Sequence, residues 1–350
     1  MKYFKLLYFL IFTGLSFLMI VAQEDGVRVE TLTGPLNASG GVCVDADGYV
    51  YVADFGITLG NSNGTNVFKI DPHTGDATVF ATGLLGASGN SFGPDGSLFQ
   101  SNIAGGRISR ITPDGQVSTF TSTNIFGPVG VAVDPEGNVF STNCANANPS
   151  ITKTTPAGVS TIFSSGPRFN CPNGLTIDDE GNLYTCNFGN GWVVKITPDG
   201  AASNLAFIPG GIGNSAGNNG HLTFANGKLY VVARCANQIF EVRISDGQAT
   251  RLAGSGARGN QDGPALQATF SIPNGIRASR TGDTLYVNDA VDLTGGCFNG
   301  PLNPVVVRMI IGVNPTTGIE RIDEATPEVF ELSQNFPNPF NPATNIHFRL

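Results

Sequence analysis

The chain has 350 residues, of which 13% are charged, and its formal net charge at pH 7 is −8. Its 19 Lys and Arg residues form no basic stripe that could follow a phosphate backbone, which argues against a nucleic-acid-binding protein. The 46 glycines are typical of an all-β chain with many tight turns.

Residues 1–22 have the order of a secretory signal peptide. Lys2 and Lys5 precede an apolar stretch that runs to Ile20, and Val21 and Ala22 then offer small residues for cleavage. The apolar stretch is short for a membrane span, so export is favoured over a membrane anchor. No later segment is long and apolar enough to cross a bilayer, and we expect an exported mature chain.

A strand–turn–strand signature recurs six times, most clearly in residues 173–184. Each copy has a glycine in its turn and a second glycine seven residues earlier. The turn glycines are Gly48, Gly96, Gly137, Gly181, Gly227 and Gly282, and the earlier glycines are Gly41, Gly89, Gly130, Gly174, Gly220 and Gly275. A period of this kind indicates supersecondary units that bury their faces only against one another.

A second hairpin follows each copy, as in residues 109–115 and 194–200, and then a final strand, as in 116–120. Four strands in each of six repeats predict an all-β fold, a six-bladed β-propeller of four-stranded blades. We place this domain at residues 23–325. Residues 27–32 and 319–322 both fit the last-strand pattern, so either segment could close the ring.

In an antiparallel hairpin, the start of the first strand and the end of the second strand lie at the same end. Two rings of residues should therefore meet at one mouth of the central channel. The first ring is Gly40, Ser88, Val129, Asn173, Asn219 and Asn274. The second ring is Asp54, Asn102, Asn143, Asn187, Ala233 with Arg234 beside it, and Asp289.

We predict that the polar members of these rings bind a ligand. They are Asn173, Asn219, Asn274, Asp54, Asn102, Asn143, Asn187, Asp289 and Arg234, together with His221, which lies near the mouth or points into the channel. Amides suit neutral hydroxylated ligands because each offers a donor and an acceptor. Phe55, Phe188 and Phe298 lie in the neighbouring loops. For any single amide the competing interpretation is structural, since Asn and Asp beside glycine also cap strand ends.

All six cysteines lie after the signal peptide, which favours disulfides in an exported chain. The sequence has no Cys-x-x-Cys pair, which argues against zinc. We predict bridges between neighbouring blades, Cys144–Cys171 and Cys186–Cys235.

The tail changes character at about residue 326. A run rich in proline and asparagine, residues 335–342, precedes an alternating strand at 345–350. This run resembles the start of the C-terminal sorting domain of type IX secretion cargo in Gram-negative bacteria. The resemblance implies that residues 326–350 are a linker and the truncated start of that domain. It also implies passage through the periplasm to the cell surface or medium, with the type IX secretion machinery as partner. A proline-rich linker is the competing interpretation.

Residues 172–175 (Pro-Asn-Gly-Leu) and 273–276 (Pro-Asn-Gly-Ile), with the turns and strands that follow, resemble NHL-repeat propellers and the gluconolactonase (senescence-marker-like) family. The second hairpins are also similar to those of streptogramin lyases. The lactonase resemblance implies a divalent cation, usually calcium, bound by a glutamate, an asparagine and an aspartate at the mouth. Asn173 or Asn274 matches the asparagine position, whereas Ser39 and Gly40 occupy the glutamate position. The aspartate position falls on Asn219 or Asn274, so Asp54 and Asp289 are the nearest charges.

These observations leave two functions open. The first is a secreted monomer that binds a small molecule, glycan or peptide at the mouth, without catalysis. The second is a calcium-dependent, lactonase-like hydrolase with Asn173, Asn274 and Asp289 as candidate metal ligands. A streptogramin-type lyase needs a histidine base, and of His73, His221 and His347 only His221 lies near the mouth.

Overall fold

The structure is a computed structural model that describes residues 26–145, 147, 149–209 and 218–314, and short strands within 331–349. The chain divides into two units, Met1–Val313 and Asn314–Leu350. The predicted signal peptide and the predicted boundary at 325 lie outside the described residues.

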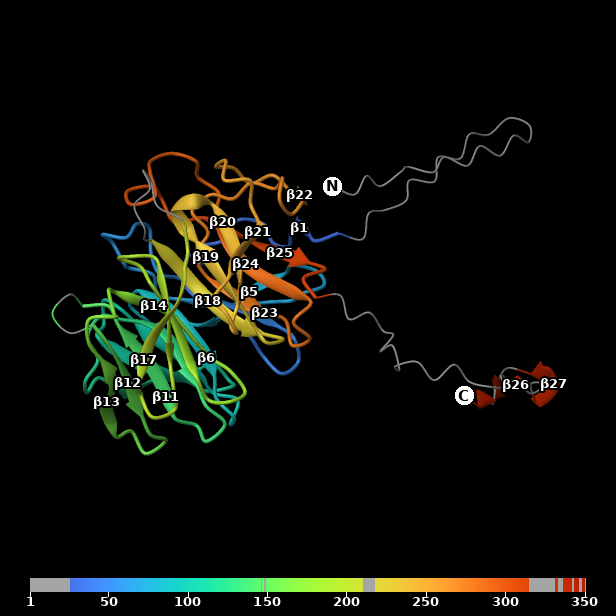
Figure 1. Cartoon of the computed structure of the whole chain (residues 1–350), viewed down its shortest axis with the longest axis horizontal. Coiled ribbons are helices and arrows are strands. Elements are labelled where there is room, and N and C mark those ends of the chain that lie inside the picture. The colour runs from blue at the N-terminus through green and yellow to red at the C-terminus, as the bar shows by residue number, and fades with distance from the viewer. Residues whose placement is uncertain are drawn as a thin grey trace. The chain divides into compact units, whose positions relative to one another are not determined.

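The first unit is a six-bladed β-propeller of antiparallel sheets, as predicted, and in blades 1–5 the strands follow one another outward in chain order (Figure 1). Blade 1 contains β2 (Val42–Val44), β3 (Val50–Ala53), β4 (Val67–Ile70) and β5 (Ala77–Ala81). Blade 2 contains β6 (Ala87–Phe92), β7 (Leu98–Asn102), β8 (Arg107–Ile111) and β9 (Val117–Thr121). Blade 3 contains β10 (Pro128–Val133), β11 (Val139–Asn143), β12 (Ser150–Thr154) and β13 (Ser160–Ser165).

The remaining blades keep this pattern with two additions, a short 3-10 helix in blade 5 and a fifth strand in blade 6. Blade 4 contains β14 (Pro172–Ile177), β15 (Leu183–Asn187), β16 (Trp192–Ile196) and β17 (Ala202–Phe207). Blade 5 contains β18 (Asn219–Ala225), β19 (Lys228–Ala233), η2 (Arg234–Ala236), β20 (Gln238–Arg243) and β21 (Ala249–Ala253). Blade 6 contains β23 (Ile276–Ala278), β24 (Thr284–Ala290), β25 (Val305–Ile311), β1 (Arg28–Thr31) and β22 (Gly263–Pro264).

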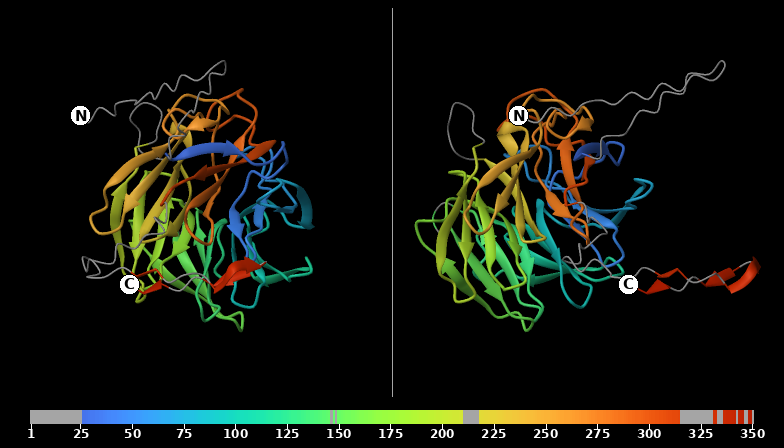
Figure 2. Two further views of the ribbon diagram at one scale, coloured as in Figure 1. Left: turned by 90° about the vertical axis from the view of Figure 1, so that its right-hand side faces the viewer. Right: turned by 45° about the vertical axis from the view of Figure 1, so that its right-hand side comes forward.

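The ring is closed by the N-terminal strand. In Figure 2, β1 (dark blue) lies beside β25 (orange-red), and the two pair antiparallel with Val29 opposite Ile310. Val29 is fully buried in the core between blades 5 and 6. Of the two candidate segments, residues 27–32 thus supply the strand next to β25 in blade 6. Residues 319–322 lie outside the described part of the chain.

The inner strands meet at the ring of early glycines. A Cβ placed on Gly41 would lie 2.7 Å from Gly89 Cα, and one on Gly89 would lie 2.9 Å from Gly130 Cα. A Cβ on Gly130 would lie 2.4 Å from the carbonyl oxygen of Asn173. Any side chain at these positions would overlap the next blade, so glycine is required there by close approach.

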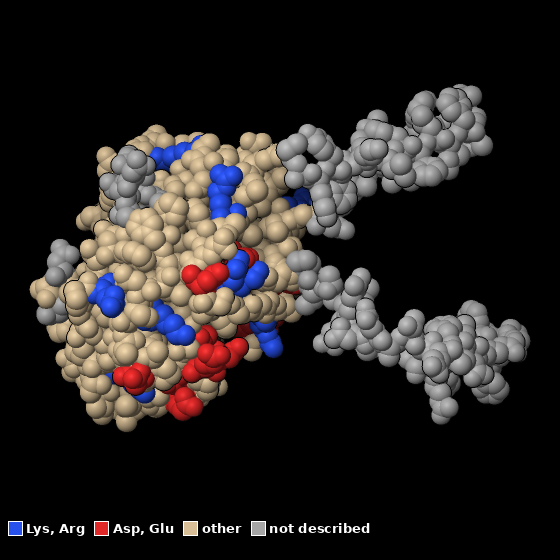
Figure 3. Space-filling model, in the orientation of Figure 1, with Lys and Arg blue, Asp and Glu red and all other residues tan. Residues whose placement is uncertain are grey.

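The hydrophobic core is split between neighbouring blades, since most buried clusters join two successive sheets. One cluster packs Tyr184 and Val193 of blade 4 against Leu222 and Leu229 of blade 5. The surface, by contrast, is sparsely charged. On the face shown in Figure 3, Lys and Arg side chains are scattered and form no continuous patch, and several lie beside Asp or Glu side chains.

Two disulfides join neighbouring blades. The bridge Cys144–Cys171 links blades 3 and 4 as predicted. The predicted bridge Cys186–Cys235 is wrong: Cys235 pairs with Cys297, and Cys186 is a free, buried cysteine. Cys186 lies within β15, where side chains alternate between faces, and its thiol donates to the Gly220 carbonyl of blade 5 at 3.0 Å. It therefore points away from the mouth, where Cys235 lies.

The second unit contains β26 (Glu331–Leu332), β27 (Phe336–Asn341), β28 (Ala343–Asn345) and β29 (Phe348–Arg349). β26 pairs with β29, and β27 pairs with β28. The sorting-domain prediction falls on this segment, and the rest of it lies outside the described residues. Within the described residues, no helix is long and apolar enough to span a membrane.

Candidate functional site at the propeller mouth

Residues from all six blades line a cavity of about 220 Å³ at one end of the inner strands. Its polar lining is Ser88, Asn173, His221, Arg234 and Asn274. Its apolar lining is Phe55, Leu59, Ile103, Val129, Phe188 and Leu302, together with the bridged Cys144 and Cys171. The sequence-predicted mouth is therefore a real pocket on the channel axis, and it contains four of the predicted binding residues.

His221 reaches the axis because the first strand of blade 5 is shifted by one residue relative to the repeat pattern of the other blades. β18 and β19 are joined by the two residues Asn226 and Gly227, whereas five residues, 134–138, join β10 and β11. A shift of one residue exchanges the two faces of a strand. As a result His221, rather than Gly220, occupies the place that glycine has in other blades: its backbone N–H donates to the Asn274 carbonyl at 2.8 Å, as Gly41 donates to Ser88.

The imidazole of His221 extends across the channel from blade 5 towards blade 2. A Cβ placed on Gly89 would lie 3.2 Å from the Cε1 atom of His221. Burial lowers the pKa of His221 to about 4, so the ring is neutral at physiological pH. His221 thus forms an uncharged polar floor of the cavity.

Asn173 and Asn274 line the cavity wall and are held by the next blade. The Asn173 side-chain N–H donates to the Asn219 carbonyl at 2.9 Å, and that of Asn274 donates to the Ser39 carbonyl at 2.8 Å. Their side-chain oxygens accept no hydrogen bond from another described residue, so they are available as acceptors. Asn219 itself is fully buried outside the cavity because of the one-residue shift in blade 5.

Arg234 is the charged group of the site. It begins η2, directly after β19, and its side chain lines the cavity with only 1% of its surface exposed. All three guanidinium nitrogens lack a hydrogen-bond partner. Burial, with a smaller contribution from the nearby positive charge of Arg258, lowers the pKa of Arg234 to about 9, so it remains protonated at neutral pH.

The structure does not bring most of the second predicted ring into the cavity. Asn102, Asn143, Asn187 and Asp289 are fully buried. Their side-chain oxygens accept the backbone N–H of Leu85, Phe126, Asn170 and Ser271, respectively, at 2.6–3.1 Å. Each of these side chains thus fixes the loop that enters its own blade, which is the structural role named above as the competing interpretation.

The two predicted carboxylates are also bonded within the protein. Asp289 forms a fully buried ion pair with Arg308 at 3.0 Å, and Arg308 also contacts Asp262 at 2.7 Å. Asp54 accepts a hydrogen bond from the Asn303 side chain at 2.8 Å. Neither aspartate lines the cavity.

The cavity lining does not fit calcium. A hard dication needs several oxygen ligands, usually with carboxylates among them, and no Asp or Glu lines the cavity. The described residues contain no cluster of three or more His, Cys, Asp and Glu side chains arranged to hold a metal. The buried positive charge of Arg234 would moreover repel a cation. The set Asn173, Asn274 and Asp289 is therefore not gathered into one coordination site.

Sequence reasoning missed most of the apolar wall. Leu59, Ile103 and Leu302 come from connecting loops whose path is not encoded by the repeat, and they pack in one cluster with Phe55. Of the three predicted aromatic residues, Phe55 and Phe188 line the cavity. Phe298 is 54% exposed and contacts Phe188 edge-on, with ring centroids 6.5 Å apart.

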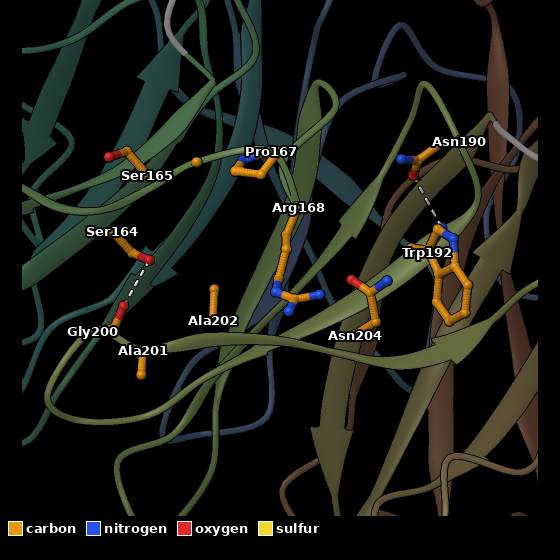
Figure 4. Close-up of a pocket in the computed structure, with 11 residues that line it drawn as sticks. Ser164, Ser165, Pro167, Arg168, Asn190, Trp192, Gly200, Ala201, Ala202 and Asn204 are labelled. Carbon is orange, nitrogen blue, oxygen red and sulfur yellow. Dashed lines mark hydrogen bonds between the residues drawn. The ribbon is translucent and has the colours of Figure 1, made fainter.

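A larger hollow of about 650 Å³ lies at the outer edge of blades 3 and 4 (Figure 4). Arg168 and Trp192 project into it, and Ser164 donates to the Gly200 carbonyl at 2.8 Å. None of the buried, unpaired polar atoms of the described residues belongs to this hollow. The mouth cavity has such atoms and is the better candidate site.

Fold and cavity together define a six-bladed propeller with a pocket at the mouth of its channel. The family model of the SMP-30/gluconolactonase/LRE-like region matches residues 18–212, which is more than half of the chain. The chain therefore belongs to this family. Among curated proteins, no sequence matches it significantly.

Several solved structures share the propeller. An auxiliary nutrient binding protein from Bacteroides ovatus is 16% identical with a TM-score of 0.63, and the match covers 81% of this chain and 76% of that chain. A gluconolactonase from Xanthomonas campestris is 17% identical with a TM-score of 0.58, over 81% and 90% of the two chains. Virginiamycin B lyase from Staphylococcus aureus is 17% identical with a TM-score of 0.52, over 81% and 99%. At these identities the similarity shows a common fold only.

Proposed function

We propose that this protein is an exported, monomeric binding protein that holds a small molecule in the mouth of its propeller. The observation that carries the proposal is the cavity of about 220 Å³ to which all six blades contribute, with polar atoms left unpaired on an apolar wall. Such a concave, mostly apolar site with few convergent polar groups is typical of small-ligand binding. A glycan or peptide would enter only by one terminal group, because the cavity is small.

Export is supported by the disulfides and by the sequence at both ends of the chain. The two disulfides are typical of proteins from oxidising compartments. The sequence of residues 1–22 has the order of a signal peptide, and residues 335–350 resemble the start of a type IX sorting domain. Among the structural neighbours, the Bacteroides ovatus protein is an auxiliary nutrient binding protein, and a binding role for the present chain agrees with that.

Membership of the gluconolactonase-containing family favours a second candidate, hydrolysis of a lactone. The calcium ligands expected for it do not converge at this mouth. A hydrolase would then have to use His221 as a base, and a histidine with a pKa of about 4 is a weak one. We therefore rank binding first.

The test uses the full chain and thermal melting in the presence of small carboxylic acids, their amides, amino acids, monosaccharides and lactones. We expect at least one compound to raise the melting temperature of the wild type, because a ligand that binds only the folded state stabilises it. Val129→Trp fills the cavity and should abolish the shift. Val79→Trp is the matched control, since Val79 is 56% exposed on β5 of blade 1.

A shift that persists in Val129→Trp, or a panel without any shift, would contradict the proposal. Calcium-dependent turnover of gluconolactone by the wild type, lost in Val129→Trp, would instead support the hydrolase.

A further inference from the structure

We propose that the ligand of the mouth cavity carries a carboxylate that pairs with Arg234 and an apolar body that fills the rest of the cavity. This inference rests on the proposed function and names the ligand class of the same site. It departs from the neutral hydroxylated ligands that the amide pattern suggested.

Arg234 has no hydrogen-bond or ion-pair partner among the described residues, unlike two other arginines of blade 6 and of the connection that precedes it, Arg308 and Arg258. Arg308 is fully buried between Asp262 and Asp289. The Arg258 guanidinium donates to the Ser271 hydroxyl at 3.0 Å and to backbone carbonyls of residues 292–295. The three nitrogens of Arg234 are just as inaccessible to bulk water and donate to nothing.

No hydrogen bond or ion pair joins Arg234 to a carboxylate of the described residues. The buried aspartate of blade 6, Asp289, is held by Arg308, and Asp54 is held by Asn303. The sequence between Gly210 and Gly217, which precedes β18 in the same blade, contains no acidic residue. The charged residue that contributes to the lowered pKa of Arg234, Arg258, is itself positive.

An unpaired buried charge destabilises a fold by several kcal/mol in typical cases, so its presence calls for a compensating partner. A bound carboxylate supplies one, because its two oxygens match the guanidinium fork in a bidentate, charge-assisted pair. The local backbone fixes the position of the arginine: Cys235 next to it is bridged to Cys297, and Asn237 ends η2 in a left-handed conformation.

The rest of the cavity selects against a bare inorganic anion. Phe55 and Leu302 are more than nine-tenths buried and pack with Leu59 and Ile103 to form a continuous apolar wall. A carboxylate with a hydrocarbon or aromatic body would bury that body there, whereas phosphate would leave the wall uncovered. Asn173 and Asn274 then offer acceptors to polar groups on the ligand.

The experiment compares isosteric pairs that differ only in charge. Phenylacetate and phenylacetamide, and hexanoate and hexanamide, are titrated calorimetrically into the full chain, with inorganic phosphate as a third arm. We expect each carboxylate to bind at least tenfold more tightly than its amide, and phosphate to bind more weakly than both carboxylates. In Arg234→Met we expect carboxylate affinity to fall by about 30-fold or more, as when one partner of a buried charge pair is removed.

Two further variants separate binding from folding. Arg234→Met should melt at the same temperature as the wild type or higher without ligand, because an unpaired buried charge has been removed; a structural arginine would give a lower value. Arg234→Lys should retain part of the carboxylate preference. Arg243→Gln, at the opposite end of blade 5 where Arg243 is exposed, should bind like the wild type.

Equal affinity for acid and amide, or unchanged carboxylate binding in Arg234→Met, would overturn the inference. If neutral compounds bind, and Val129→Trp abolishes this binding whereas Arg234→Met leaves it unchanged, the proposed binding function holds and the preference for an anion is wrong. If nothing binds in a mouth-dependent way, the proposed function itself fails.

Discussion

At the scale of single residues, the recurring side chains hold the fold and the exceptional ones build the site. The amide after the second strand recurs in three successive blades because each copy fixes an entry loop; Asn143, for example, also donates to the hydroxyls of Ser150 and Thr152 at 2.9 Å. His221 and Arg234 have no counterparts in the repeat, and both come from blade 5. Departures from the repeat were therefore a better guide to the cavity than its regularities.

The buried His221 predicts an acid-sensitive fold. Its pKa is about 4 in the folded protein against 6.5 for an unperturbed imidazole, so the unfolded chain binds more protons between these pH values. The free energy of unfolding should consequently keep this contribution above pH 6.5 and lose about 3 kcal/mol of it as the pH falls to 4. Urea unfolding between pH 7 and pH 4.5 measures this loss.

His221→Gln should flatten this pH dependence, because the titrating group is removed. The matched control is His73→Gln, since His73 is exposed in the turn after β4 and should leave the slope unchanged. A slope in His221→Gln equal to that of the wild type would show that other groups cause the acid sensitivity.

At the scale of elements, the close approach of the inner strands can be tested at Gly130. Its backbone N–H donates to the Thr142 hydroxyl at 2.7 Å, and an added methyl group would meet the Asn173 carbonyl at 2.4 Å. We expect Gly130→Ala to lower the free energy of unfolding by about 2–3 kcal/mol or more through overpacking. Denaturant titration measures it, and Gly34→Ala, where an added methyl group meets nothing within 4 Å, should change little. Equal stability of the two variants would contradict the packing argument.

The repeat predicted the number of blades, their hairpins and the end of the molecule at which the cavity lies. The prediction was wrong where a shift of one residue reverses the direction in which a side chain points. Cys186 stands one residue before Asn187, so strand alternation directs its thiol to the neighbouring blade and not to Cys235. Likewise, the short Asn226–Gly227 turn shifts β18 and moves His221 into the position of the ring glycine. An Asn-Gly pair between strands is a known two-residue hairpin signal, so this second shift was encoded in the sequence.

At the scale of the whole molecule, the ring is closed by one blade that combines strands from both ends of the described propeller. The sequence offered two candidates for the outer strand of blade 6 because both match the last-strand pattern. Local pattern could not choose between them, since the choice depends on which segment completes the buried interface between blades 5 and 6. β1 does so, placing Val29 with Phe270 and Ile310 in that core.

Closure by β1 makes the stability of the entire propeller depend on a strand of four residues. Val29→Asp would bury a carboxylate without a partner in this strand, and we expect it to lower the free energy of unfolding by roughly 3 kcal/mol or more. Because each blade is stabilised by both neighbours, the loss should appear as one cooperative transition at lower denaturant rather than as local fraying. Arg28→Ala is the control, since Arg28 forms only an exposed ion pair with Glu30, at 2.7 Å, and such pairs contribute about 1 kcal/mol or less.

A chain ending at Asn314 should unfold like the full chain, because it lacks residues 319–322 but retains β1. If that truncation destabilised the propeller while Val29→Asp did not, the C-terminal segment and not β1 would be the strand that closes the ring.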